Sequence, residues 1–142
     1  MSAKIAYDGV EVGTELPART FTVTRATLVR YAGASGDFNP IHWNEKFAKE
    51  VGLPDVIAHG MFTMAEAIRV VTDWVGDPGA VVEYGVRFTK PVVVPNDEQG
   101  ATIEVSAKVA AKLDDNTVRV DLTATSAGQK VLGMSRAVVR LA

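Results

Sequence analysis

The chain has 142 residues, of which 47% are hydrophobic and 23% charged, with a formal net charge of −2 and no cysteine. This length suits one domain, 1–142, that can bury a core without disulfides. The composition excludes disordered and fibrous chains, and the lack of cysteine excludes disulfides, thiolate nucleophiles and cysteine metal ligands. Lysine and arginine form no basic run, so the sequence gives no electrostatic footprint for nucleic acid.

The N-terminal residues 1–12 carry three charged side chains and lack the apolar core of a secretory signal. No apolar run approaches the ~18 residues that cross a bilayer. A chain without cysteine is also typical of a reducing compartment. We therefore expect a cytoplasmic protein that does not enter a membrane.

Residues 9–36 are predicted to hold extended pieces followed by a helix. Pro17 interrupts the extended pieces, and apolar and polar residues alternate again over 20–24. Thr24 is a natural N-cap, and Gly36 is of the type found just past a helix end. These signals predict a helix between Thr24 and Gly36.

The middle of the chain is predicted to contain a long buried helix. Pro40 breaks any regular element in the polar segment "GDFNPIHWN", and a short helix is expected around 45–51. A helix of about fifteen residues then ends at Gly76, where glycine is favoured. Apolar residues occupy most of its circumference, which is typical of a helix buried on all sides. These residues are Met61, Met64, Ala65, Ala67, Ile68, Val71, Trp74 and Val75.

The last third of the chain is rich in predicted strands, separated by the turn signals "PND", "LDDN" and "SAGQ". The expected strands are 81–89, 102–113, 117–125 and 130–141. Long strands joined by tight turns indicate an antiparallel sheet. Several α+β folds share this order of elements, and the simplest packing wraps one sheet around the long central helix. The fold class expected is therefore α+β, as a single hot-dog fold.

The segment "SGDFNPIH" contains a candidate acid–base pair, Asp37 and His42. A loop bent at Pro40 can turn both side chains into one pocket, and Asn39 can hold the bend through hydrogen bonds to the backbone. Histidine exchanges protons near neutral pH, and a neighbouring carboxylate can share a water molecule with it. The spacing is equally compatible with Asp37 as a turn cap and His42 as a partly buried structural histidine.

The segment "AHGM" places Gly60 at the start of the central helix. The first turn of a helix presents free N–H groups, and glycine lets a ligand approach them closely. Such a donor can polarise a thioester carbonyl. Alternatively, Gly60 is a plain connection between loop and helix, with His59 a loop histidine.

Other active-site and nucleotide-binding motifs are absent. The spacing of the two histidines does not match a zinc motif such as HExxH, and Ser35-Gly36 does not form a GxSxG nucleophile elbow. No GxGxxG or GxxxxGK loop occurs, so binding of dinucleotides or nucleoside triphosphates has no motif support.

The segment "YAGASGDFNPIHWNEKFA", residues 31–48, resembles the signature of the MaoC-like (R)-specific hydratase and dehydratase family. That signature contains Ser/Thr-Gly-Asp-x-Asn-Pro-Leu/Ile-His after an aromatic and small residues. The downstream "IAHGMFTM" resembles the start of the family's central helix, and "VVVPND" resembles a further segment of the family's sequences. Within the family the resemblance is strongest to the catalytic subunit of the actinobacterial (3R)-hydroxyacyl-ACP dehydratase.

The resemblance implies a hot-dog fold and a role for each matching residue. Asp37 and His42 would together activate water or, in reverse, take the C2 proton and protonate the departing hydroxyl. The backbone N–H of Gly60 would donate to the thioester oxygen, and Asn39 would support the loop. Some members carry a supporting serine in the central helix, but that position is Ile68 here.

The resemblance also implies the substrate and the partners. The substrate would be an acyl-CoA or acyl-ACP thioester, with no metal or other cofactor. The chain would form a homodimer, or a heterodimer with a hot-dog subunit that lacks the motif. Two alternatives remain on the same fold, a non-catalytic acyl-binding subunit and a thioesterase.

Overall fold

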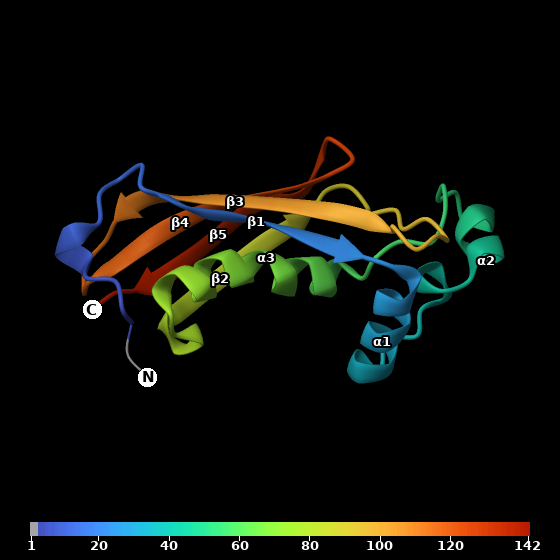
Figure 1. Ribbon diagram of the computed structural model, residues 1–142, viewed down its shortest axis with the longest axis horizontal. Coiled ribbons are helices and arrows are strands. Elements are labelled where there is room, and N and C mark those ends of the chain that lie inside the picture. The colour runs from blue at the N-terminus through green and yellow to red at the C-terminus, as the bar shows by residue number, and fades with distance from the viewer. Residues whose placement is uncertain (1–2) are drawn as a thin grey trace.

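The computed structural model describes residues 3–142, which form one five-stranded antiparallel sheet with a long helix across one of its faces (Figure 1). The strand order is β1-β3-β4-β5-β2. This arrangement confirms the predicted α+β hot-dog fold. The strands are β1 (Glu15–Val23), β2 (Val81–Phe88), β3 (Ala101–Lys112), β4 (Thr117–Ser126) and β5 (Gln129–Arg140), and the helices are α1 (Arg25–Ser35), α2 (Glu45–Glu50) and α3 (Gly60–Val75).

Alternating side chains along β3 separate the core from the outer face of the sheet. Ile103, Val105 and Val109 are at most 1% exposed, whereas Glu104 and Lys108, which alternate with them, face water. Burying each such apolar side chain contributes ~1.5–3 kcal/mol. The apolar face of the sheet therefore holds α3 in place, and α3 positions the candidate site at its N-terminal end.

Local chemistry fixes both ends of α1. Thr24 and Thr27 form a capping box, in which each side chain accepts a hydrogen bond from the other residue's backbone N–H. Gly36 ends the helix in the left-handed conformation, with a φ of 76°. Leu28 and Ala32 anchor the helix to the rest of the protein through its buried side. The predicted limits of this helix are confirmed.

Strand β1 begins earlier than the sequence pattern predicts. It runs from Glu15 through Pro17 to Val23, with a register shift between Leu16 and Arg19. β1 lies at the edge of the sheet, where a residue without an N–H can face solvent, and the strand continues past Pro17 with this shift in its pairing to β3. Pro17 therefore interrupts the pairing register, as the sequence predicts, but residues 15–23 form one strand and not separate extended pieces.

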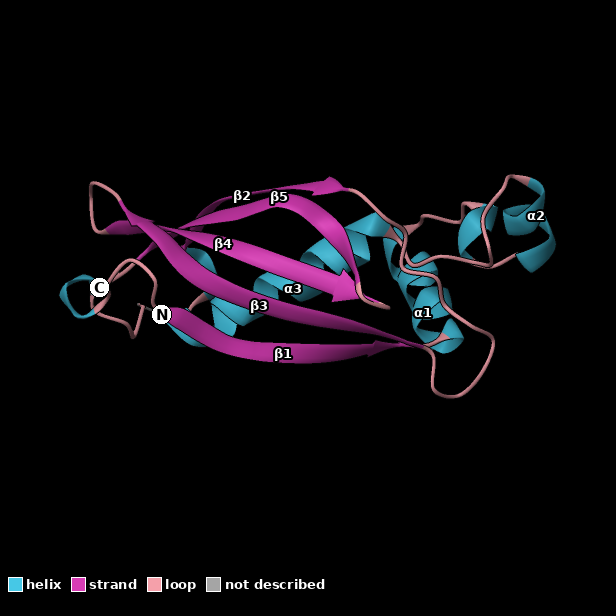
Figure 2. Ribbon diagram, turned by 90° about the horizontal axis from the view of Figure 1, so that it is seen from above, coloured by secondary structure: helices cyan, strands magenta, loops and turns pink. Residues whose placement is uncertain are grey.

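Helix α3 is buried along one side only, which corrects the prediction of a fully buried helix. The sheet covers a single side of α3 (Figure 2). Met61 is 59% exposed, and Met64 and Trp74 are only half-buried. The residues that face the sheet or the core are Thr63, Ala67, Val70, Val71 and Val75.

Helices α1 and α2 and the N-terminal end of α3 lie together at one end of the sheet (Figures 1 and 2). Between them the chain makes a 3₁₀ turn, η2 (Pro40–His42), and an extended segment. An isolated bridge from Ile57 to Val93 fastens this segment beside the sheet. Within residues 3–142, no helix has both the length and the apolar character needed to cross a bilayer.

Candidate active site

Short hydrogen bonds from side chains to the backbone shape the segment between α1 and α2. The Ser35 hydroxyl accepts from the Asp37 N–H at 3.1 Å, and the Asp37 carboxylate accepts from the Asn39 N–H at 3.1 Å. The Asn39 side chain accepts from the Ile41 N–H at 3.2 Å and caps η2. This series of turns brings the side chains of Asp37 and His42 face to face.

Asp37 and His42 approach each other without a direct hydrogen bond. The distance from His42 Nε2 to Asp37 Oδ2 is 3.9 Å, beyond hydrogen-bonding range. The His42 side chain is 8% exposed and the Asp37 side chain 51%. Both groups are therefore free to bind a third oxygen, such as that of a water molecule.

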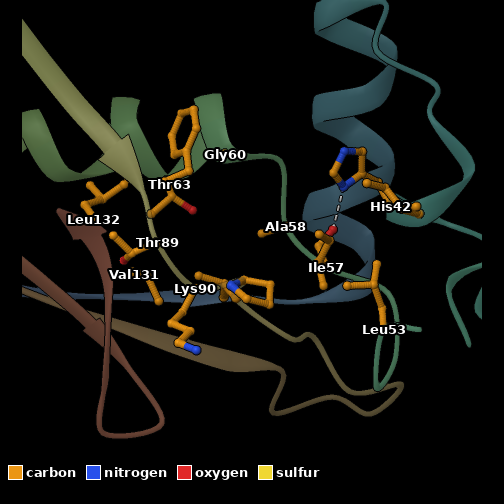
Figure 3. A pocket seen from close by; sticks show the side chains of 14 residues that line it. His42, Leu53, Ile57, Ala58, Gly60, Thr63, Thr89, Lys90, Val131 and Leu132 are labelled. Carbon is orange, nitrogen blue, oxygen red and sulfur yellow. Dashed lines mark hydrogen bonds between the residues drawn. The ribbon is translucent and has the colours of Figure 1, made fainter. Parts of the chain in front are cut away.

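The orientation of His42 is set by the backbone carbonyl of Ile57, which lies 2.7 Å from Nδ1 (Figure 3). A carbonyl can only accept, so Nδ1 carries the hydrogen and Nε2 keeps a free lone pair in the neutral ring. Burial holds the pKa of His42 below its ordinary value of 6.5. The bond to Ile57 and the carboxylate of Asp37 act in the opposite direction. The lowered pKa favours the neutral form of His42, whose free Nε2 faces Asp37.

Gly60 is the first residue of α3, so its N–H has no partner within the helix. It lies on a cavity of ≈ 410 Å³ that His42 and Thr63 also line (Figure 3). Thr63 follows one helical turn after Gly60 and is 3% exposed. The apolar part of the lining consists of Ile41, Leu53, Ile57, Ala58, Phe88, Pro91, Val92, Val131 and Leu132.

His59, which the sequence suggested only as a loop histidine, is buried beside the pair. Its side chain is 1% exposed, and its ring stacks on His42 with centroids 3.7 Å apart and planes 22° apart. His59 Nε2 lies 3.0 Å from the backbone carbonyl oxygen of Asp37. The available signal for His59 was that the chain has two histidines, one in each of the two candidate site segments.

Asp37, His42 and His59 also place possible metal-ligand atoms within 4.8 Å of one another. In stacked imidazoles, however, the nitrogen lone pairs lie in nearly parallel planes. Such lone pairs do not converge on one ion at the ~2.0–2.1 Å of a zinc–histidine bond. The arrangement of the two rings is therefore unfavourable for a shared metal ion.

The fold and this cluster can now be compared with known proteins. A family model described as a MaoC-like domain matches residues 9–127. The chain belongs to the MaoC-like family. The resemblance seen in the sequence is thereby confirmed over most of the chain.

This MaoC-like chain covers very different shares of its relatives' own length. The 3-hydroxyacyl-thioester dehydratase X of Mycobacterium tuberculosis is 47% identical over 79 residues, covering 56% of this chain and 27% of the relative. The (R)-specific enoyl-CoA hydratase of Rhodospirillum rubrum is 32% identical over 112 residues, covering 78% of this chain and 75% of the relative. A solved MaoC-like dehydratase matches with a TM-score of 0.93 and 44% identity, covering 96% of this chain and 42% of that one. The chain thus spans well under two thirds of the first and third of these proteins.

In this MaoC-like chain, the residues singled out from the sequence gather at one end of the sheet. Asn39 shapes the turn, Asp37 and His42 face each other, and Gly60 shares a cavity with His42. Sequence reasoning did not place Thr63 in the site. Its position three residues after Gly60, on the same side of α3, was the available signal.

Proposed function

We propose that this chain interconverts a (3R)-hydroxyacyl thioester and a trans-2-enoyl thioester by adding or removing water. The observation that carries the proposal is that His42 and the N-terminus of α3 line one cavity, with the carboxylate of Asp37 3.9 Å from His42 Nε2. Relatives named as a 3-hydroxyacyl-thioester dehydratase and an (R)-specific enoyl-CoA hydratase support this assignment.

In the hydration direction, water binds between Asp37 and His42, and the enoyl thioester oxygen accepts a hydrogen bond from the Gly60 N–H. One group of the pair removes a proton from the water while its oxygen bonds to C3. The group that took this proton then delivers it to C2, so the elements of water are added across the double bond. Dehydration is the reverse: a base takes the C2 proton, and the 3-hydroxyl leaves as water.

General acid–base catalysis of this kind contributes roughly 10²–10⁴-fold, and a single oxyanion donor contributes ~2.7–4 kcal/mol. The positive end of the α3 dipole also favours negative charge developing on the thioester oxygen. The apolar lining of the cavity suits an acyl chain, whose carrier is CoA or an acyl carrier protein. These contributions act together on the enolate-like transition state.

We also propose that the chain works as one half of a pair, as a homodimer or with a hot-dog subunit that lacks the motif. Strand β2 lies at the sheet edge and exposes Val82 and Phe88, at 49% and 55%. An open edge with apolar side chains favours pairing with another strand. Light scattering on wild type and Val82→Lys tests this, because a fully active wild-type monomer would contradict the pairing.

The reaction is tested by following the enoyl-thioester absorbance with crotonyl-CoA and a longer trans-2-enoyl-CoA, and with the matching acyl carrier protein substrates. Wild type is compared with Asp37→Asn and His42→Gln, and with Glu98→Gln as an exposed control. We expect loss of the band with wild type and the control, slowed at least ~100-fold in both site variants. A thiol reagent run in parallel detects thioesterase activity.

Three results would contradict the proposal. Equal rates in wild type, Asp37→Asn and His42→Gln would remove the acid–base assignment. Release of free thiol without hydration would identify a thioesterase. Tight binding of acyl thioesters without turnover of any of them would instead identify a non-catalytic acyl-binding subunit.

A further inference from the structure

His59 is a buried ionisable group that the proposed reaction does not use. It is 1% exposed and is not among the residues that line the cavity. It nevertheless contacts both members of the proposed acid–base pair, the backbone of Asp37 and the ring of His42. A buried polar side chain with these two contacts calls for a physical explanation.

The hydrogen bond of His59 defines its tautomer. The Asp37 carbonyl oxygen can only accept, so His59 Nε2, 3.0 Å away, carries the hydrogen and donates. His59 Nδ1 is buried and has no hydrogen-bond partner within residues 3–142. A second proton on Nδ1 would leave a buried N–H without an acceptor, which is unfavourable. His59 is therefore the neutral Nε2–H tautomer.

The ring of His59 fixes the ring of His42. The two rings stack at 3.7 Å, and Tyr31 packs against His59 at 4.7 Å. His42 is thus held by the stack and by the carbonyl of Ile57, with Asp37 as the one carboxylate facing it. The stack also shields part of the His42 ring from water.

We propose that His59 is a positioning residue that joins Asp37 to His42, its Nε2–H holding the Asp37 backbone and its ring holding the plane of the His42 imidazole. The inference rests on the proposed hydration activity. By covering His42, His59 also contributes to the burial that lowers the pKa of His42 and keeps it a base.

Two substitutions separate the two contacts. His59→Gln keeps an N–H donor at similar reach and removes the ring, whereas His59→Phe keeps a flat ring and removes the donor. Displacing a catalytic group by ~1 Å can lower a rate ~100-fold. We expect kcat to fall roughly tenfold to a hundredfold in each variant, with KM changed far less, since His59 lies outside the cavity. Wild-type kcat in both variants would overturn the inference.

Imidazole NMR tests the same inference without turnover. The chain has two histidines, so each His59 variant leaves His42 as its single imidazole signal. In His59→Gln the pKa of His42 should rise, because water reaches the uncovered ring. In wild type, nitrogen shifts should show His59 as the Nε2–H tautomer and His42 as the Nδ1–H tautomer.

The outcomes keep this inference separate from the proposed function. If His59 in wild type is the Nδ1–H tautomer, the inference is overturned whatever the activity. If kcat falls only in proportion to the fraction of folded protein and the pKa of His42 is unchanged, then His59 acts as an ordinary core residue. That result would overturn the inference. An inactive wild type with the expected tautomers would instead count against hydration.

Discussion

A methyl group at Gly60 should separate the proposed oxyanion role from folding. The φ of Gly60 lies outside the left-handed region, so alanine can adopt the same backbone. A Cβ at this position would lie 3.0 Å from Cε1 and 3.1 Å from Cδ1 of Phe88. The Phe88 side chain is 55% exposed, so its ring has room to turn away. We therefore expect Gly60→Ala to fold normally and to crowd the place where the thioester oxygen meets the N–H.

The size of each effect follows from this geometry. Replacing glycine by alanine at a compatible position stabilises a protein by about 0.4–1 kcal/mol, so the free energy of unfolding should not decrease. Loss of one oxyanion donor costs ~2.7–4 kcal/mol, or roughly 10²–10³ in kcat. The variant should thus be as stable as wild type and much less active.

Urea unfolding and the enoyl-thioester absorbance assay measure these two quantities. The double variant Gly60→Ala with Phe88→Leu serves as the control, because it removes the ring that the new methyl group displaces. Activity should remain low in the double variant. Wild-type kcat in Gly60→Ala, or recovery of kcat in the double variant, would refute the oxyanion role of this N–H.

Further predictions concern the acid–base pair, the cavity and the core. Combining Asp37→Asn with His42→Gln should cost little more kcat than either change alone, since the two groups act as a unit; multiplied losses would show independent roles. Because the pKa of His42 is lowered, hydration kcat/KM should be full at pH 7 and fall only below pH 6.5, as a pH–rate profile would show. Since the pKa of His42 is lower in the folded state, its contribution to the free energy of unfolding is complete above pH 6.5 and is lost as the pH falls through the folded-state pKa. Urea titrations at several pH values measure this loss. Thr63→Val should lower kcat/KM by about tenfold at most, and Thr63→Ser should retain activity, because Thr63 lines the cavity with Gly60 and its hydroxyl can hydrogen-bond the substrate; an unchanged kcat/KM in Thr63→Val would exclude this contact. Leu28→Ala should lower the free energy of unfolding by ~2–5 kcal/mol and leave kcat of the folded protein unchanged.

Features set by neighbouring residues could be predicted from the sequence. The limits of α1 follow from Thr24 and Gly36, whose cap and left-handed turn need only adjacent backbone. The approach of Asp37 to His42 likewise depends on turns within a few residues. Their catalytic role stays a prediction until the variants are measured.

Features that depend on tertiary packing could not be predicted in this way. The stacking of His59 on His42 requires the start of α3 to meet the turn after α1, and no local pattern encodes that distance. Met61 fits a helical apolar pattern, yet the sheet covers only the other side of α3. The strand through Pro17 was missed because its tolerance depends on β1 being an edge.

The continuous stretch 37–60 has a consequence for how this architecture can diversify. It holds the proposed acid–base pair, the proposed positioning histidine and the proposed oxyanion donor, whereas the strands supply the support and part of the apolar cavity lining. A few substitutions in this stretch would abolish the proposed reaction and leave the core and the sheet edges intact. A duplicated copy could thus keep the ability to pair while losing reactivity, so that two descendants of one gene could divide catalysis and substrate holding between them.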